Sequence, residues 1–362
     1  MRAVNNTRQW WMVLAAVAAL GAGCGSEPDR IPDPPINEPP IETPTRTWSW
    51  VDVPGSTCDE GTPTGLGANL SDSKNLLIFF NGGGACWDSA TCLELNVSLH
   101  GPYTKTQFDR QVAGLSRGSI FDRELANSPY KDWNHFFIPY CTGDLHIGNA
   151  EAVYTSNSVS VNFQHKGRVN AELMLARIAA TVPEPAQVVV TGSSAGGYGA
   201  VLNYTLVRSL FPNARVFLVD DAGPMLRSGA IPAPLRAAWS RAWKYDAVMD
   251  AIDPAVKNDF SAIHPALARK FPDDRMALLS SLRDQVIRGY MGLSPEQFQA
   301  ALLDLSTSVL EPLDQTRSYL VPGEGHTLLS SPGSFNVQGV PLLDWLNQMH
   351  AADGDTWKSV RP

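Results

Sequence analysis

The chain has 362 residues, of which 44% are apolar and 18% are charged, and its formal net charge is −8. This profile is typical of a globular protein with a sizeable core, and the length suits one large α/β domain. The acidic balance argues against a nucleic-acid-binding protein, which needs a basic surface, and gives no support to a polyanionic ligand.

The N-terminus is predicted to be an export signal. Two arginines precede an apolar run over residues 10–22 that is too short to span a bilayer comfortably. The run leads into the sequence LGAGC, which resembles a bacterial lipobox with Cys24 as the lipidated residue. Residues 1–23 are therefore expected to be a signal peptide, and Ser26 favours the outer membrane or cell surface for the lipoprotein. The alternative is an ordinary signal peptide cut nearby and a secreted protein.

Residues 24–47 are expected to form an extended tether behind the lipid anchor. The stretch 25–47 holds seven prolines and several acidic residues, a composition that favours polyproline-like chain. From Trp48 to Val53 the sequence alternates like a strand, so the folded domain is predicted to span residues 48–362. No later stretch is long and apolar enough for a transmembrane helix, so the anchor would be the only membrane contact.

Beyond Trp48, short apolar strands alternate with helical patterns. The predicted strands are 48–53, 76–80, 136–138, 187–190, 216–219, 276–279 and 318–321, and the predicted helices include 169–182, 195–210 and 341–350. Continuous apolar strands alternating with helices predict an α/β fold with a mostly parallel central sheet covered by helices on both faces. A helical insertion at about 224–272, rich in Trp and Tyr, is interpreted as a cap over the active site, the alternative being a surface insertion without a substrate role.

The strand at 187–190 leads into a serine motif. The sequence GSSAG at 192–196 fits G-x-S-x-G between a strand and a helix, which is the context of a nucleophile elbow. Glycines are needed on both sides because side chains in so tight a turn would clash with the neighbouring strand and helix. Ser194 is the predicted nucleophile, since the offset of Ser193 would not put it at the tip.

A glycine-rich loop supplies a candidate oxyanion hole. Residues 81–85, NGGGA, follow the strand at 76–80, as the corresponding loops of esterases do. Glycine lets backbone N–H groups approach a developing oxyanion without a Cβ in the way. The predicted donors are the amides of Gly83, Gly84 and Ala195. A phosphate-binding loop is the alternative, but no lysine follows at the required spacing.

Three histidines follow Ser194 and compete for the role of general base. Because this fold orders its triad as Ser, acid, His, His326 is favoured: it lies in a glycine-rich loop just past the strand at 318–321. His264 falls inside the predicted cap, and His350 is interpreted as a surface residue of the last helix.

The acid is expected after the strand that precedes the histidine strand. Asp284 follows the strand at 276–279 and is the predicted acid, which would orient His326 and stabilise its imidazolium. Asp220 and Asp221, after an earlier strand, are the alternative. Two further aspartates are interpreted as loop or surface charges, Asp304 and Asp314. Asp144 after the strand at 136–138 either lines the pocket or belongs to a loop pinned by a disulfide.

Export implies an oxidising compartment for the cysteines. Without Cys24, four remain, which allow three disulfide connectivities. Cys86 and Cys92 are close enough to close a small local loop, and that pairing would leave Cys58 with Cys141. A zinc site is the rival interpretation, weakened because neither CxxC pairs nor HExxH occur. We therefore expect no metal and no cofactor.

Several motifs together resemble one family. They are TCD at 57–59, NGGGACWD at 81–88 with the following Cys92, IPYCTGD at 138–144 and GSSAGG at 192–197. The chain resembles the pectin acetylesterase/Notum family of the α/β-hydrolase superfamily. The resemblance places Asp284 and His326 where the family's acid and base would lie and supports the Cys58–Cys141 and Cys86–Cys92 pairings. It implies hydrolysis of carboxylic esters, such as acetyl groups on polysaccharides or fatty acyl groups on proteins.

The sequence thus predicts a monomeric serine esterase that acts through an acyl-enzyme on an extracellular ester, such as an acetylated polysaccharide. A catalytically silent carbohydrate-binding or adhesion lipoprotein on the same scaffold is the alternative from another class. Two further alternatives are also enzymes but act on other substrates, namely a polyester depolymerase and a peptidase.

Overall fold

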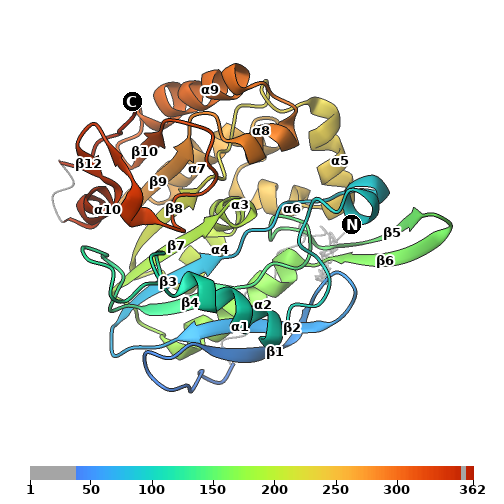
Figure 1. Cartoon of the computed structure of the whole chain (residues 1–362), viewed down its shortest axis with the longest axis horizontal. Helices are drawn as coiled ribbons and strands as arrows, with labels where there is room; N and C mark the ends of the chain where they lie inside the picture. Colours follow the sequence, from blue (N-terminus) through green and yellow to red (C-terminus); the bar gives the residue numbers. More distant parts are fainter. Residues whose placement is uncertain (1–37, 352–355) are drawn as a thin grey trace, which may run out of the picture. The chain divides into compact units, whose positions relative to one another are not determined.

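An eight-stranded sheet forms the centre of the computed structural model, which describes residues 38–351 and 356–362 (Figure 1). The strand order is β1-β2-β4-β3-β7-β8-β9-β10. The strands are β1 (Ser49–Thr57), β2 (Pro63–Asn69), β3 (Asn75–Phe80), β4 (Asn134–Ile138), β7 (Gln187–Ser193), β8 (Arg215–Asp221), β9 (Arg275–Ser281) and β10 (Thr316–Val321).

Most of the sheet is parallel, as the alternation of strands and helices predicts. Strands β4, β3, β7, β8, β9 and β10 pair in parallel, whereas β1 and β2 join antiparallel at one edge. Two short sheets lie outside it, a hairpin of β5 (Ala150–Ser156) and β6 (Val159–His165) and a pair of β11 (Asn336–Val337) and β12 (Val340–Pro341). The β5–β6 hairpin extends away from the central sheet (Figure 1).

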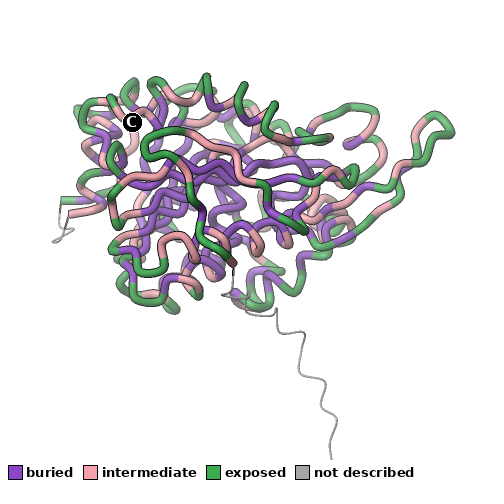
Figure 2. Tube along the Cα trace, turned by 90° about the horizontal axis from the view of Figure 1, so that it is seen from below, coloured by how far each residue is buried: buried purple, intermediate pink, exposed green. Residues whose placement is uncertain are grey.

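Alternation within the central strands divides the core into two layers. In β3, Leu76, Ile78 and Phe80 belong to one buried cluster, and Leu77 and Phe79 belong to the other. Strands buried on both faces need apolar residues at every position, which explains the continuous runs seen in the sequence. The burial trace shows these strands as buried segments inside the domain (Figure 2).

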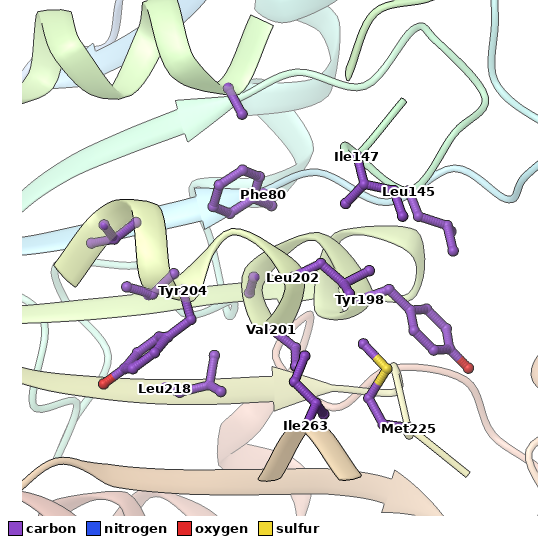
Figure 3. Close-up of a cluster of buried hydrophobic side chains, with 14 of the residues drawn as sticks. Phe80, Leu145, Ile147, Tyr198, Val201, Leu202, Tyr204, Leu218, Met225 and Ile263 are labelled. Atoms are coloured by element: carbon purple, nitrogen blue, oxygen red, sulfur yellow. The ribbon is translucent and has the colours of Figure 1, made fainter. Parts of the chain in front are cut away.

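Helices cover both faces. The first cluster includes buried side chains of α2 (Gly167–Thr181), α3 (Ala195–Leu202), α4 (Tyr204–Leu210) and α7 (Ile263–Lys270), and part of it is seen around Tyr198 and Val201 in Figure 3. The second includes those of α1 (Lys105–Leu115) and α10 (Leu342–His350). The remaining helices are α5 (Ala233–Trp243), α6 (Asp246–Ile252), α8 (Gln285–Met291) and α9 (Pro295–Asp304). This is the α/β-hydrolase architecture expected from the sequence.

The helix predicted over 195–210 is two helices. The break falls at Asn203, whose buried side-chain amide donates to the carbonyls of His146 and Gly199 and accepts from Arg168. Asparagine side chains compete with backbone groups in this way, so they often mark a helix end.

The described end of the segment predicted as a tether contacts the domain. Cys24 and the expected signal peptide lie outside the described residues. From Glu38 onward, however, the chain packs on the domain: Ile41 is buried and its amide donates to Thr181 at 2.9 Å, and Glu38 pairs with Arg177 at 3.5 Å. An apolar residue among the prolines provides this anchor, so the folded unit starts before the predicted boundary at Trp48.

The predicted cap divides into two parts. Its last helix, α7, packs into the core through Ile263, Ala266 and Leu267. The first part, α5 and α6, contributes buried side chains to the same cluster, among them Trp239 and Trp243, whose rings stack with centroids 5.6 Å apart. That the first part caps the active site remains a proposal. None of the helices among the described residues is long and apolar enough to cross a membrane.

Candidate active site

Ser194 occupies a sharp turn between β7 and α3. It has φ 61° and ψ −123°, a backbone conformation that a non-glycine residue rarely adopts and that functional turns retain. The flanking glycines are required by space: a Cβ on Gly196 would lie 1.9 Å from the carbonyl oxygen of Phe80, and one on Gly192 would lie 2.2 Å from that of Gly196. The turn has the geometry of the predicted nucleophile elbow.

His326 is held by a buried carboxylate. Oδ2 of Asp284 accepts a hydrogen bond from Nδ1 of His326 at 2.7 Å. Its Oδ1 caps helix α8, accepting from the amides of Val286 at 2.9 Å and Ile287 at 3.0 Å. These bonds fix the carboxylate, which in turn fixes the imidazole and leaves Nε2 as the ring nitrogen available for proton transfer. The structure therefore brings the predicted acid and base together.

Asp221, the alternative acid, contacts the histidine loop instead of the imidazole. Its Oδ1 accepts from the amide of Leu328 at 2.7 Å, and its Oδ2 accepts from the amide of Leu329 at 3.0 Å and from Oγ of Ser193 at 2.6 Å. Burial raises the pKa of Asp221 above its usual range. In addition, the carbonyl oxygen of Asp221 accepts from the amide of Ser194 at 2.7 Å. This residue therefore links the serine turn to the loop that carries His326.

Of the other candidate bases, His264 is buried in the core and His350 is half-buried among aromatic rings. Neither ring nitrogen of His264 has a hydrogen-bond partner, and burial lowers its pKa to about 4. The interpretation of His350 as a surface residue is wrong. Its ring packs against Trp133 and Phe217 and its Nε2 lies 3.1 Å from the hydroxyl of Tyr130, because the helix turns this face toward the sheet.

The remaining candidate acids do not reach the imidazole either. Asp220 is buried and its Oδ1 accepts from the amide of Gly223 at 2.8 Å. Asp304 pairs with Arg227 at 3.0 Å on the exposed surface, as expected for a surface charge. Asp144 is buried and accepts from Thr142 and from the amide of Gly167, so it pins its own loop. Burial raises the pKa of Asp144 to about 6.

The glycine loop lies directly against the serine turn. A Cβ on Gly82 would lie 2.3 Å from the carbonyl oxygen of Ser193, and one on Gly84, at φ 76°, would lie 2.1 Å from that of Val97. The loop can approach this closely only because it is glycine. Ala195 is the first residue of α3, so its amide is among those that have no acceptor within the helix. The amides of Gly83, Gly84 and Ala195 remain the proposed oxyanion donors.

Two disulfides stabilise the surroundings of this loop. Cys86 bonds to Cys92 and Cys58 bonds to Cys141, the pairings that the family resemblance supports. The indole of Trp243 donates to the carbonyl oxygen of Cys86 at 2.9 Å and so ties α5 to the loop. No group of His, Cys, Asp or Glu side chains within the described ranges is arranged to hold a metal ion.

Two cavities of very different size meet at Ser194. The large cleft, of about 540 Å³, is lined by residues of the glycine loop, of segment 96–99, of α1 and the following loop to Phe121, and by His326. The small cavity, of about 30 Å³, is apolar and is lined by Gly84, Ala195, Trp239 and Tyr290, among others.

Tyr290 is a site residue that the sequence patterns did not reveal. It lines both cavities, its hydroxyl donates to the carbonyl oxygen of Val97, and it accepts from the amide of Ala85 at 3.4 Å. The sequence offers one signal, namely that Tyr290 lies six residues after Asp284 on the same helix. This signal becomes useful only once Asp284 is known to be the acid.

The fold and this arrangement define the class: the protein is an α/β-hydrolase with a candidate serine triad. Residues 49–263 match the family model described as Pectinacetylesterase, which is more than half of the chain. The chain belongs to the pectinacetylesterase family.

The chain is also similar to individual proteins. The chain is 26% identical over 227 residues to pectin acetylesterase 7 of Arabidopsis thaliana, covering 61% of this chain and 51% of that protein. It is 28% identical over 177 residues to the palmitoleoyl-protein carboxylesterase NOTUM of Drosophila melanogaster, covering 46% of this chain and 25% of that one. A solved structure of the Wnt deacylase Notum from Drosophila has the same fold, with a TM-score of 0.62 and 18% identity over 87% of this chain and 95% of that one. The chain thus spans about half, or less, of the length of these curated relatives.

Proposed function

We propose that the protein is a serine carboxylic-ester hydrolase. The observation that carries the proposal is the Asp284–His326 pair, whose imidazole lines the same cleft as Ser194 at a strained elbow. His326 would accept the proton of Ser194 as the serine attacks the ester carbonyl. The glycine-loop amides and that of Ala195 would hold the oxyanion, each such donor being worth about 3–4 kcal/mol in related sites. After the alcohol leaves, water activated by His326 would hydrolyse the acyl-enzyme.

The small cavity supports a short acyl group. It lies beside Ser194, Gly84 and Ala195, where the carbonyl substituent of a bound ester would point. A cavity needs roughly 10–15 Å³ to hold one water, so about 30 Å³ has room for a group of acetyl size. The alcohol half would then occupy the large cleft. We infer that the substrate is an acetyl or similarly short ester of a carbohydrate outside the cell.

The named relatives favour the same chemistry. Those relatives are, by name, pectin acetylesterases and palmitoleoyl-protein carboxylesterases, and both names describe enzymes acting on acyl groups. The size of the small cavity favours the acetylesterases over enzymes for long acyl chains.

Hydrolysis of p-nitrophenyl acetate by the wild type, Ser194→Ala and Ser193→Ala tests the proposal. Ser194→Ala should lower kcat/KM to the background rate. Ser193→Ala should retain most of the activity because its hydroxyl bonds to Asp221 and is not at the tip of the turn. Background rates in all three proteins would instead favour a silent carbohydrate-binding module. A series of longer p-nitrophenyl esters should show a steep loss beyond short chains, and a preference for long chains would contradict the acyl assignment.

We also propose that the protein is exported and anchored by a lipid on Cys24. The two disulfides fit an oxidising compartment. In a bacterial host, Cys24→Ala should move the protein from the membrane fraction to the soluble fraction, and an unchanged distribution would contradict the anchor. A sedimentation measurement that gives the mass of one chain would support the expected monomer.

A further inference from the structure

The large cleft is lined mainly by apolar surface, into which uncharged polar side chains are set. Among the residues that line it, His326 is the only histidine, and none is Lys, Arg, Asp or Glu. Its polar side chains are amides and hydroxyls, including Asn96, Ser98, Gln111 and Ser330. These alternate with apolar side chains such as Leu99 and Phe121.

We propose that the alcohol half of the substrate is a neutral, hydroxyl-rich carbohydrate and that polyuronates, the backbone of pectin, are poor substrates. The inference rests on the proposed esterase function and assigns its acceptor.

The cost of burying charge supports this assignment. In an acetylated polyuronate, the sugar that carries the ester also carries a carboxylate, so cleavage brings that carboxylate into the cleft beside Ser194. An anion that leaves water without a compensating partner loses several kcal/mol. Sites for polyanions offset this loss with clustered Lys and Arg, which the lining of this cleft does not contain.

Charges next to the cleft make a polyanion less favourable still. Behind His326 lies Asp284, and behind Ser193 lies Asp221, both buried carboxyl groups. Arg288, on the same helix as Tyr290, is paired with Glu324 at 3.3 Å. Two further arginines, Arg110 within α1 and Arg117 just after it, are exposed and outside the lining. The chain as a whole carries −8.

The neutral groups of the cleft suit sugar hydroxyls. Gln111 is held by reciprocal bonds with Asn81, at 2.8 Å and 3.2 Å, and by the hydroxyl of Tyr103 at 2.6 Å. A fixed amide can donate its remaining N–H to a hydroxyl without paying to order its own side chain. Apolar side chains between such groups suit the C–H faces of sugar rings, as in most small-molecule sites.

Acetate release from acetylated xylan and from acetylated polygalacturonate, matched in acetate content, tests the proposal, with p-nitrophenyl acetate as a control for esterase activity. We expect kcat/KM at least about tenfold higher on the neutral polymer at low ionic strength. Added salt should narrow the gap by screening the polyanion and should leave the xylan rate unchanged. Equal or faster cleavage of the polyuronate would overturn the proposal, as would cleavage of p-nitrophenyl acetate with neither polymer accepted.

A charge added to the lining sharpens the test. Ser330 is exposed and lines the cleft. Ser330→Arg should raise the ratio of polyuronate to xylan cleavage several-fold, whereas Ser330→Gln, similar in length and uncharged, should not. No change with Ser330→Arg would contradict an electrostatic origin of the preference.

A failure of the esterase proposal can be distinguished from a failure of the proposal that the cleft prefers neutral carbohydrates. If p-nitrophenyl acetate is not cleaved, the esterase proposal fails, and calorimetric binding of the two polymers to the same protein decides the preference of the cleft alone. Binding of xylan without polygalacturonate would then support a neutral carbohydrate site, and the reverse would overturn it.

Discussion

Residues 49–263 and residues 264–362 contribute to the candidate active site in different ways. The first part matches the family model and holds the elbow, the glycine loop and both disulfides. The second part lies beyond the match and holds Asp284 and His326. In the first part each position is fixed by local constraints, such as glycines packed against backbone. In the second part, the acid and the base are identified by the hydrogen bond between Asp284, which follows β9, and His326, which follows β10.

The difference shows that the match to the family model by itself covers Ser194 but neither Asp284 nor His326. The two parts pair along β8 and β9, and Asp221 at the end of β8 also bonds to the amides of Leu328 and Leu329 just after His326. Variants in residues 49–263 and in residues 264–362 test how strongly the position of His326 depends on contacts from the first part.

The largest effect is expected at the acid. Asp284→Asn should lower kcat/KM for p-nitrophenyl acetate by roughly 10³–10⁴-fold, because an amide NH₂ facing Nδ1 favours the wrong tautomer of His326 and cannot stabilise its imidazolium. Asp304→Asn is the control, since Asp304 is exposed and remote from the imidazole contact, and it should leave the rate within a factor of about two. A loss of less than tenfold in Asp284→Asn would place the acid elsewhere.

A smaller effect is expected at the contact between the parts. Asp221→Asn removes one acceptor for the histidine loop and should lower kcat by roughly 10–100-fold, as small displacements of a catalytic group do, while KM changes little. Asp220→Asn is the neighbouring control: burial holds the pKa of Asp220 well above its usual range, so a neutral amide resembles its native state. Equal kcat values in the two variants would show that the link from Asp221 does not position His326.

The smallest effect on catalysis is expected at His264, the first residue past the family match to be considered as a base. His264→Leu should leave kcat unchanged and alter only the pH dependence of stability. Because the folded-state pKa is about 4, below the usual 6.5, stability is fully present above pH 6.5 and is lost as pH falls toward 4. The free energy of unfolding of the variant, relative to that of the wild type, should therefore rise by about 2–3 kcal/mol when the pH is lowered from 7.5 to 4.5.

Urea denaturation at the two pH values measures this difference. His100→Gln is the opposite control, because the hydrogen bond that the imidazole of His100 donates to the carboxylate of Asp59 raises the pKa of His100, and the resulting stabilisation is lost as pH rises. If the free energy of unfolding, relative to wild type, changes in the same direction in both variants as the pH is lowered, the burial argument for His264 is contradicted.

The elements that carry the elbow and the glycine loop could be predicted because their signals are local. Apolar runs defined the parallel strands, and glycine spacing located Ser194 and Gly83. The β5–β6 hairpin and α1 were not predicted because their sequences are partially exposed and alternate weakly, and β2 was not predicted because it is buried with little apolar side chain, its sequence being PTGLGAN. The burial of His350 and the bonds of Asp221 depend on elements distant in sequence, so local patterns do not contain them.

The central claim is that His326, from the unmatched part, activates Ser194, from the matched part. The most direct measurement is the rate at which diisopropyl fluorophosphate labels the protein, with the modified residue located by mass spectrometry, in wild type and His326→Ala. The account predicts one label on Ser194 and a rate at least about 100-fold lower in the variant, in line with general-base catalysis. Labelling at another residue, or equal rates in the two proteins, would contradict it.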